Sequence, residues 1–348
     1  MTLKVGVIGC GYISYAHIRG WKANGCEVAA LCDLSAGRLN ARAEEFGVQN
    51  KYTDYKEMLE RENLDIVDIA TPVSTHRALI SYCCSRVSNI LCEKPFVDNM
   101  ENGEYLVREC KKYGCRTMVC QSYRWHPWYE QIKKELKNDV IGSPYYVNIM
   151  QRISFDIPYG KENRIPLTED QPFYEHAERL MLLEQGCHYF DVFRSLFGEP
   201  QAVTGTVGRI SPFVKGDDLA VVTVVFPGLT AVLEDVWCSC GQQKTSVTYI
   251  QGEKGSIYFG GTDGIAPHRT EECGSLTITF FDGSSRQIEM EAADYYNQSF
   301  AKLQAHFLHC IDQGLTPDTC FEDNLKTVSI ALRAYESAAK KRTIFMGE

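Results

Sequence analysis

Residues 4–14 read KVGVIGCGYIS, and they are the most informative segment about the fold. An apolar run with β-branched residues leads directly into Gly9 and Gly11, and a segment with helical spacing follows. The first glycine permits a tight turn and the second lets the backbone approach a pyrophosphate, with Tyr12 and Ile13 completing the turn. The N–H groups at the start of the helix would then meet the anion. This order of strand, glycine turn and helix predicts a dinucleotide-binding unit.

The remainder of the first 120 residues repeats the alternation of strand and helix. Such alternation predicts a parallel sheet with right-handed crossovers, in which ligands bind beyond the carboxyl ends of the strands. The expected strands are residues 4–8, 27–32, 66–69, 89–92 and 117–120, and the expected helices are residues 13–24, 35–46, 54–60, 74–85 and 99–113.

The sequence changes character after Cys120, which predicts two domains, 1–121 and 122–348. Residues 156–174, with their prolines and charges, are expected to form a loop that covers the substrate. Closely spaced extended segments predict an antiparallel or mixed sheet, so the second domain is expected to be α+β. The expected strands there are residues 145–153, 202–210, 219–226, 230–238, 245–250, 256–259, 276–281 and 287–290, and the expected helices are residues 180–197, 298–313 and 324–341.

Asp33 stands at the end of the second expected strand, 24 residues after Gly9. An acidic residue near this offset bonds the adenosine ribose hydroxyls and repels a 2′-phosphate, which favours NAD over NADP. Arg38 follows about one helical turn later and could bind a phosphate, so NADP stays as the less favoured alternative. In the structural alternative, Gly9 and Gly11 form an ordinary turn and Asp33 is only a helix N-cap.

Polar residues follow two more strands of the expected parallel sheet. Thr71, Pro72 and His76 come after the third strand and are expected beside the cofactor, as is Glu93 after the fourth. Lys94 would stand at the mouth of the ligand crevice, where a cation can stabilise a developing alkoxide. A lysine after a strand is otherwise most often a solvated surface charge.

A second group of polar residues has helical spacing in the expected helix 180–197. Glu184 and His188 are four residues apart and Asp191 follows three later, so the spacing predicts that all three share one face. A carboxylate beside an imidazole orients the ring and raises its basicity, as a general base requires. The alternative is a helical ion pair with a structural histidine.

Three motifs together resemble the Gfo/Idh/MocA family, which includes glucose–fructose oxidoreductase and inositol dehydrogenase. They are the glycine turn, the Glu-Lys-Pro turn at 93–95 and the Gly-x-His-x-x-Asp pattern at 186–191. The resemblance extends over almost the whole chain. Two positions depart from the family pattern: Ser14 stands where the third glycine or alanine is usual, and Glu184 stands where catalytic members usually have aspartate.

The resemblance implies a Rossmann domain followed by an α+β domain whose open sheet face is used to form a homodimer or homotetramer. It implies an NAD(P)-dependent oxidoreductase that transfers hydride between nicotinamide and a secondary hydroxyl of a sugar, polyol or glycoside. Lys94 would contact that hydroxyl, His188 would be its acid/base, and Glu184 would assist. The expected substrate contacts are Tyr123, Arg124, Trp125, Arg152 and Asp191.

Two other functions stay open at this point. An enzyme of this family could keep its NAD bound and recycle it during conversion or cleavage of a glycoside. A non-catalytic member could bind a dinucleotide or sugar and regulate a partner, although members without catalysis usually lack the lysine or histidine, and both are present here.

Charge and composition exclude several classes of protein. Lys and Arg number 36 against 45 Asp and Glu, a net charge of −9, which argues against a nucleic-acid or membrane surface as partner. The N-terminus lacks the pattern of a signal peptide and no apolar run could span a bilayer, so a cytoplasmic protein is expected.

Cysteine and histidine patterns give no metal site. The 15 cysteines include no Cys-x-x-Cys pair, so they are expected to be reduced core thiols. His306, His309 and Cys310 share a helical face, but no fourth ligand has suitable spacing. We therefore interpret these three as packing residues of an amphipathic helix.

Overall fold

The computed structural model describes residues 2–152, 172–212, 214–238, 245–261, 275–290 and 294–347. The chain divides into two compact units. Unit 1 contains Met1–Ser122 and Asn297–Val328, and unit 2 contains Tyr123–Tyr296 and Ser329–Glu348. The predicted domain boundary after residue 121 stays a prediction. Unit 1 also contains a C-terminal segment, Asn297–Val328, which the prediction placed in the second domain. The expected substrate-covering loop falls outside the described residues except at its C-terminal end.

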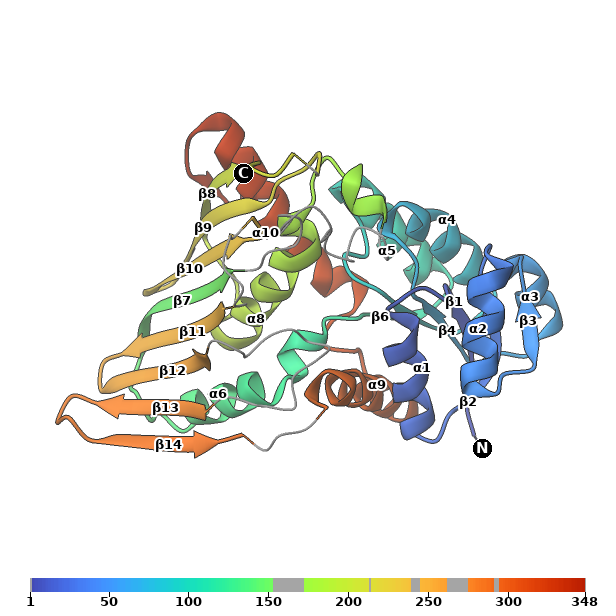
Figure 1. The fold of residues 1–348 in the computed structure, drawn as a ribbon, viewed down its shortest axis with the longest axis horizontal. Helices are drawn as coiled ribbons and strands as arrows, with labels where there is room; N and C mark the ends of the chain where they lie inside the picture. The colour runs from blue at the N-terminus through green and yellow to red at the C-terminus, as the bar shows by residue number, and fades with distance from the viewer. Residues whose placement is uncertain are drawn as a thin grey trace, which may run out of the picture. The chain divides into compact units, whose positions relative to one another are not determined.

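Unit 1 is built on a six-stranded sheet in the order β3-β2-β1-β4-β5-β6 (Figure 1). All five neighbouring pairs are parallel, so the carboxyl ends of the strands share one edge, as the sequence predicts. The strands are β1 (Lys4–Ile8), β2 (Glu27–Cys32), β3 (Asn50–Tyr52), β4 (Ile66–Ile69), β5 (Asn89–Cys92) and β6 (Arg116–Val119), and the helices between them are α1 (Ser14–Ala23), α2 (Ala36–Phe46), α3 (Tyr55–Arg61), α4 (Val73–Cys83) and α5 (Met100–Lys112).

Local chemistry explains where these elements lie. Every residue of β4 and β5 is buried, as expected for strands covered on both faces of a parallel sheet. Helix α2 begins where the Ser35 hydroxyl accepts a hydrogen bond from the Arg38 N–H, and it ends at Gly47 in the left-handed conformation. The parallel sheet with alternating helices, which the sequence predicts and which the family resemblance implies as a Rossmann domain, is the one observed.

Unit 2 contains a nine-stranded sheet in the order β14-β13-β12-β11-β7-β10-β9-β8-β15. Its β7 and β10 are parallel and the other described pairs are antiparallel, so the sheet is mixed, as predicted. The strands are β7 (Pro144–Arg152), β8 (Ala202–Gly208), β9 (Leu219–Phe226), β10 (Leu229–Val236), β11 (Thr245–Gly252), β12 (Gly255–Gly261), β13 (Ser275–Phe280), β14 (Ser285–Glu289) and β15 (Ile344–Phe345). The longer helices after residue 122 are α6 (Pro127–Lys137), α8 (Cys187–Phe197), α9 (Tyr295–Gln313) and α10 (Phe321–Lys340), of which most of α9 and the start of α10 belong to unit 1.

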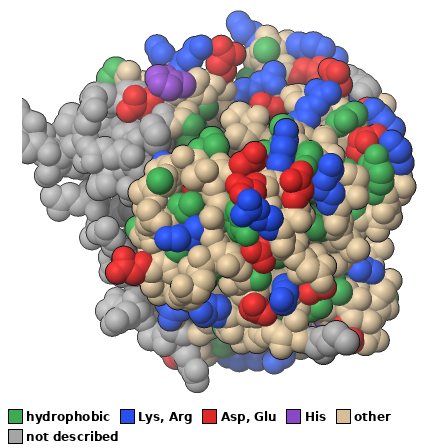
Figure 2. Space-filling model, turned by 90° about the vertical axis from the view of Figure 1, so that its right-hand side faces the viewer, with side chains coloured by type: hydrophobic (Ala, Val, Ile, Leu, Met, Phe, Trp, Pro, Cys, Tyr) green, Lys and Arg blue, Asp and Glu red, His purple; other side chains and the backbone are tan. Residues whose placement is uncertain are grey.

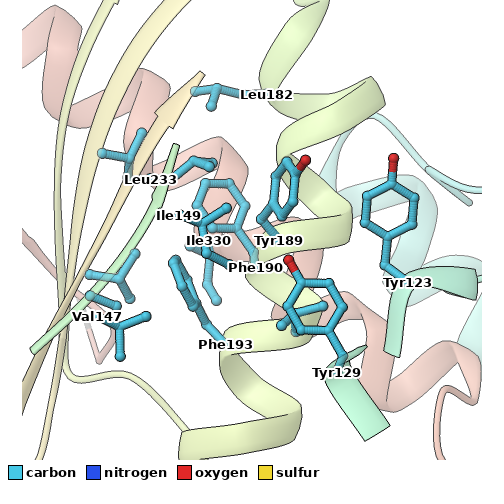
Figure 3. Close-up of a cluster of buried hydrophobic side chains, with 14 of the residues drawn as sticks. Tyr123, Tyr129, Val147, Ile149, Leu182, Tyr189, Phe190, Phe193, Leu233 and Ile330 are labelled. Atoms are coloured by element: carbon cyan, nitrogen blue, oxygen red, sulfur yellow. The ribbon is translucent and has the colours of Figure 1, made fainter. Parts of the chain in front are cut away.

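The core of unit 2 lies between one face of this sheet and its helices. Burial alternates along β10, so every second residue points toward the core. Figure 3 shows Val147 and Ile149 of β7 and Leu233 of β10 packed against Phe190 and Phe193 of α8. We call this side the inner face of the sheet and the opposite side the outer face.

Several elements differ from the expected ones. Helix α6 and the short strands β3 and β15 have no counterpart among the predicted elements. Helix α6 begins with Pro127, which fits the first turn of a helix because its missing N–H is not needed there. Within the expected helix 180–197, residues Leu182–Gly186 form a π-helical turn rather than an α-helix.

The described surface carries charges of both signs. In Figure 2 the Lys and Arg side chains are interspersed with Asp and Glu on the face that is shown. Among the helices of the described residues, none combines the length and the hydropathy that a membrane span requires.

Candidate active site

The glycine turn lies between β1 and α1. Gly9 has φ 102°, and a Cβ atom there would lie 2.5 Å from the Ala70 carbonyl oxygen, so only glycine fits without strain. A Cβ at Gly11 would meet no atom within 4 Å, so the loop is open at that point. Ile13 is the residue before α1, and its side chain makes no capping hydrogen bond to the start of the helix. The first N–H groups of α1 are therefore suited to an anion such as a phosphate.

Asp33 lies directly after β2 and is nearly buried. Its carboxylate accepts hydrogen bonds from the Cys10 N–H at 2.8 Å and the Ser35 N–H at 2.7 Å. The Arg38 guanidinium donates to it at 3.0 Å, although the Arg38 side chain is 60% exposed. Burial acts to raise the pKa of Asp33, but these hydrogen bonds outweigh it and lower the pKa. The carboxylate therefore stays ionised beside the glycine turn.

The turn after β4 is held by its own side chains. Thr71 and Thr75 share a hydrogen bond of 2.7 Å between their hydroxyls, and the Thr75 hydroxyl also donates to the Pro72 carbonyl. The His76 ring is buried, with Nε2 2.7 Å from the Thr71 carbonyl oxygen and Nδ1 3.1 Å from that of Phe96. His76, itself a predicted cofactor contact, thus connects this turn to the turn after β5, and both of its ring nitrogens contact backbone carbonyl oxygens.

Glu93 and Lys94 follow β5, and Glu93 belongs to a buried polar network. One Glu93 carboxylate oxygen accepts a hydrogen bond from the Lys94 backbone N–H at 2.9 Å. The other lies 3.0 Å from Nε2 of His17, a residue of α1. Nδ1 of His17 lies 2.8 Å from an oxygen of Asp68 in β4, and the Trp21 indole donates to that same oxygen at 2.6 Å. Neither His17 nor Asp68 belongs to the predicted site residues.

His17, Glu93 and Cys120 each carry an atom of a kind that can bind a metal ion. These three atoms lie within 4.8 Å of one another. The imidazole, however, faces a carboxylate oxygen with each of its two nitrogens. A protonated ring, with two N–H donors, satisfies this geometry without an ion. We therefore interpret the three residues as a hydrogen-bonded cluster.

In unit 2, His188 lies near the start of α8 and its side chain is buried. Its ring stacks on Tyr123 with the ring centroids 4.0 Å apart and the planes 9° from parallel. The Tyr123 hydroxyl accepts a hydrogen bond of 2.8 Å from the Gln185 amide. The Tyr189 hydroxyl in turn donates to Gln151 at 2.8 Å. Figure 3 shows Tyr189 on the helix α8 and Tyr123 on the neighbouring segment.

Glu184 lies in the π-helical turn that precedes α8, and it is buried. A π-turn adds one residue to a helical turn and occurs often at functional sites. The Asp217 carboxylate accepts hydrogen bonds from the N–H groups of Leu180 and Leu182, which fixes the start of this segment. A periodicity of 3.6 residues does not predict such a turn.

Two predicted substrate contacts pair with each other. The Arg124 guanidinium makes two hydrogen bonds to the Asp191 carboxylate, at 2.6 and 2.7 Å, and both side chains are largely buried. Trp125 ends the same short 3-10 helix that holds Tyr123 and Arg124. Arg152 pairs instead with Glu234 at 2.7 Å. Residues 152 and 234 lie on the outer face, so Arg152 is not brought together with α8.

His306 of α9 is held by hydrogen-bond contacts within unit 1. His306 Nε2 accepts a hydrogen bond from the Asp318 N–H at 3.1 Å and lies 3.6 Å from the Cys310 thiol. Cys310 is buried. These contacts agree with the packing role expected from the sequence.

Two family models match the chain. The model described as an oxidoreductase family with an NAD-binding Rossmann fold, GFO/IDH/MocA, matches residues 3–121. The model of the GFO/IDH/MocA C-terminal domain matches residues 129–258. Between them they cover the glycine turn, Lys94 and His188.

Curated and solved proteins resemble the chain over nearly its full length. The D-apiose dehydrogenase of Paraburkholderia graminis is 28% identical over 346 residues, which cover 98% of this chain and 89% of that protein. The myo-inositol 2-dehydrogenase of Thermotoga maritima is 24% identical over 99% of both chains. A solved oxidoreductase from Agrobacterium radiobacter, in complex with NAD+, L-tartaric acid and magnesium, matches with a TM-score of 0.86 and 26% identity over 100% of this chain and 99% of that one.

Proposed function

The chain belongs to the GFO/IDH/MocA oxidoreductase family, and on that premise we propose that it is an NAD-dependent dehydrogenase that oxidises a secondary hydroxyl of a sugar or polyol. The observation that carries this proposal is the edge of the parallel sheet in unit 1. The glycine turn, Asp33 and Lys94 all follow strands at that edge, which is where ligands of such sheets bind. Relatives that act on D-apiose and on myo-inositol supply the substrate class.

The residues at this edge fit NAD. The backbone of the turn at Gly9 and Gly11 leaves room for a pyrophosphate, because a Cβ at Gly11 would meet nothing within 4 Å. The ionised Asp33 would accept hydrogen bonds from the ribose hydroxyls and disfavour the 2′-phosphate of NADP. Tyr12, Ile13, Thr71 and Pro72 line the same two turns. When bound, NAD supplies the acceptor for the hydride that leaves the substrate carbon.

Two steps of the reaction besides hydride transfer are assigned to Lys94 and His188: removal of the hydroxyl proton and stabilisation of the developing negative charge. As the hydroxyl carbon loses hydride, its oxygen must lose a proton to become a carbonyl oxygen. We assign proton removal to His188, with Glu184 as the carboxylate that supports its basicity. The Lys94 ammonium donates a hydrogen bond to the same oxygen and stabilises the negative charge that develops there.

Tyr123, Arg124 and Trp125 are the proposed substrate contacts at the start of unit 2. The stack of Tyr123 on His188 fixes the plane of the imidazole, and the Gln185 amide fixes the tyrosine. Arg124 can donate to a substrate hydroxyl only with the N–H groups that its pair with Asp191 leaves available. Asp191 therefore acts through Arg124, and Arg152 is omitted because it lies on the outer face.

The outer face of the nine-stranded sheet favours association of two or four copies of the chain. It carries Val232 of β10, Tyr249 of β11 and Tyr258 of β12, and Val221 of β9 is 42% exposed there. Exposed apolar patches on a sheet are typical of protein interfaces. The 13 described cysteines are free thiols, which favours a reducing compartment such as the cytoplasm.

Two substitutions test the function. Lys94→Ala and His188→Ala should each lower kcat for the best sugar or polyol substrate by about 10²- to 10⁴-fold, the usual contribution of an acid/base group. The Kd for NAD should stay nearly unchanged, because the dinucleotide contacts are left intact. Lys112→Ala, at an exposed position of α5, is the matched control and should keep full turnover.

The assay follows NAD reduction against a panel of sugars, inositols and glycosides. Unchanged turnover in both variants would contradict the assignment of Lys94 and His188. Product formation without net NADH would instead indicate a retained, recycling cofactor.

A further inference from the structure

The polar network beneath Lys94 lies wholly within unit 1. His17 of α1 is fully buried between Asp68 of β4 and Glu93, with its ring nitrogens 2.8 and 3.0 Å from their oxygens. The second Glu93 oxygen accepts the Lys94 N–H. A continuous chain of hydrogen bonds therefore connects the interior of the sheet to the backbone of the proposed catalytic lysine.

We propose that His17, held as an imidazolium between Asp68 and Glu93, is the positioning residue that sets the charge and direction of Lys94. This inference rests on the proposed function, in which the Lys94 ammonium stabilises the developing alkoxide. It adds a buried cation, at the fourth residue of α1, to the groups on which that reaction depends.

The hydrogen-bond geometry suits a charged ring. Each ring nitrogen faces a carboxyl oxygen, and an ionised carboxylate only accepts, so with both carboxylates ionised each nitrogen carries a proton. Burial acts to lower the pKa of His17, but Asp68 and Glu93 outweigh it and raise the pKa to about 10. The ring is therefore an imidazolium throughout the physiological range.

The charges of the network balance. Asp68 and Glu93 supply two negative charges, and His17 and Lys94 supply two positive ones. Burial acts to raise the pKa of Glu93, whereas its bonds to His17 and the nearby Lys94 charge lower it. A buried charge is tolerated when it is paired, and removal of one partner leaves the other uncompensated. Loss of the His17 charge would thus drive Glu93 toward its neutral form.

Four further groups of the described residues that lie beside the network, Trp21, Phe300, Cys92 and Cys120, are neutral. The Trp21 indole donates to Asp68, and the Phe300 ring lies 5.0 Å from the His17 ring between centroids. Burial raises the pKa of the Cys92 and Cys120 thiols well above the ordinary value, so neither supplies a charge. The charge beside Lys94 is therefore set by His17, Asp68 and Glu93 together.

Lys94 is held from both sides along the chain. Glu93 accepts the Lys94 N–H, and His76 contacts the Phe96 carbonyl on the other side. The direction in which the backbone of the lysine leaves β5 is thus fixed by buried groups. Such preorganisation is what an electrostatic stabiliser of a transition state needs.

The variants His17→Asn and Glu93→Gln test the inference. Asparagine keeps one donor but removes the charge, and glutamine keeps the shape of the Glu93 side chain. Each should lower kcat by about tenfold or more, as expected when a catalytic group is misplaced, with KM for NAD changed less than about twofold. The alkaline limb of the kcat–pH profile should move to lower pH, because the carboxylate that stabilises the Lys94 ammonium is lost or neutralised.

Two control variants separate this effect from a loss of stability. Trp21→Phe removes a hydrogen bond to Asp68 without changing any charge, and Ile80→Val removes one buried methyl group from α4. Both should lower Tm and leave the pH profile of kcat in place. Equal shifts of the profile in all four variants would overturn the positioning role.

Lys94→Ala distinguishes failure of this inference from failure of the proposed function. If Lys94→Ala keeps full turnover, the function assigned to the lysine is wrong. If Lys94→Ala is inactive while His17→Asn and Glu93→Gln keep the wild-type profile, the function stands and the inference is wrong.

A measurement on the unaltered protein covers the case in which the variants do not fold. Imidazole ¹⁵N chemical shifts should show one histidine with both nitrogens protonated at about pH 8, where ordinary histidines are neutral. Its signal should be absent from any folded His17 variant. A neutral His17 ring at that pH, or a stoichiometric metal ion found by elemental analysis, would overturn the proposal.

Discussion

Asp68 lies in the interior of β4, between Val67 and Ile69, in a strand whose residues are all buried. A buried carboxylate costs several kcal/mol unless it is paired and hydrogen-bonded. His17 and Trp21 provide that pairing from α1. A single acidic residue inside an otherwise apolar strand is thus a signal that a buried cation lies nearby, and here the cation is next to the proposed catalytic edge.

Asp33 is the residue through which the preference for NAD over NADP can be tested. Asp33→Asn should weaken NAD binding by about tenfold, or about 1.4 kcal/mol, because a neutral amide accepts ribose hydroxyls less well than a carboxylate. It should also improve NADP binding, since repulsion of the 2′-phosphate disappears while Arg38 stays nearby. Calorimetric Kd values for both dinucleotides measure the two effects.

Asp65→Asn is the matched control for that experiment. Asp65 also accepts a backbone N–H, from Lys4, but it precedes β4 and so lies at the opposite edge of the parallel sheet. Its substitution should leave both Kd values unchanged. If the ratio of the Kd values for NAD and NADP in Asp33→Asn equals that of the wild type, the assignment of Asp33 to the cofactor site is wrong.

At the scale of elements, the segment before α8 shows how tertiary contacts override a regular helix. Leu182–Gly186 form a π-turn whose start is fixed by the Asp217 carboxylate, which lies outside the helix. Tyr335 of α10 donates to the same carboxylate at 2.7 Å. The position of Glu184 is therefore set by three segments of unit 2 together.

The contact between β8 and α10 gives a prediction for the second unit. A Cβ at Gly205 would lie 2.5 Å from the Ala334 carbonyl oxygen, and the Gly205 N–H donates to the Ser337 hydroxyl at 3.0 Å. Gly205→Ala should destabilise the protein by about 1–3 kcal/mol, because the helix must move away from the strand. Thermal or denaturant unfolding measures this loss.

Gly208→Ala supplies the comparison on the same strand. The nearest atom to a Cβ there is a side-chain carbon of Leu219 at 3.6 Å, an ordinary contact. Its stability should change by less than about 1 kcal/mol, since alanine also reduces the entropy of the unfolded chain. Equal losses in the two variants would show that close packing on α10 is not the cause.

At the scale of the whole molecule, His17 should make stability depend on pH. Its folded pKa of about 10 exceeds the value of 6.5 for an ordinary histidine. The stabilisation is therefore complete below about pH 6.5, declines above it and is gone once the pH has risen through about 10. Lowered pKa values of Asp33 and Glu93 act at the acid end, where their contribution is lost as the pH falls.

Tm measured from pH 6 to 10 should thus fall more steeply in the wild type than in His17→Asn. Buried thiols with a raised pKa, such as Cys92, also lose stability at high pH, but they do so equally in both proteins. Parallel Tm curves would show that His17 is not an imidazolium in the folded chain.

Association through the outer face of the sheet is the remaining prediction for the whole molecule. Val221→Lys places a charge on that face and should convert the proposed dimer or tetramer into smaller species, because a buried unpaired charge is costly. Light scattering coupled to size-exclusion chromatography measures the mass. Leu315→Lys, an exposed apolar position of unit 1, should leave the mass unchanged.

The sequence by itself determined the parallel sheet of unit 1, its glycine turn and the candidate residues Asp33, Lys94 and His188. These features are local: a strand, its turn and the next helix are specified by neighbouring residues. Three features became visible only in the folded chain: Asp68 lies beside His17, Arg124 pairs with Asp191, and a π-turn precedes α8. Those contacts join residues far apart in the chain, and their energy depends on burial and charge pairing that no local pattern contains.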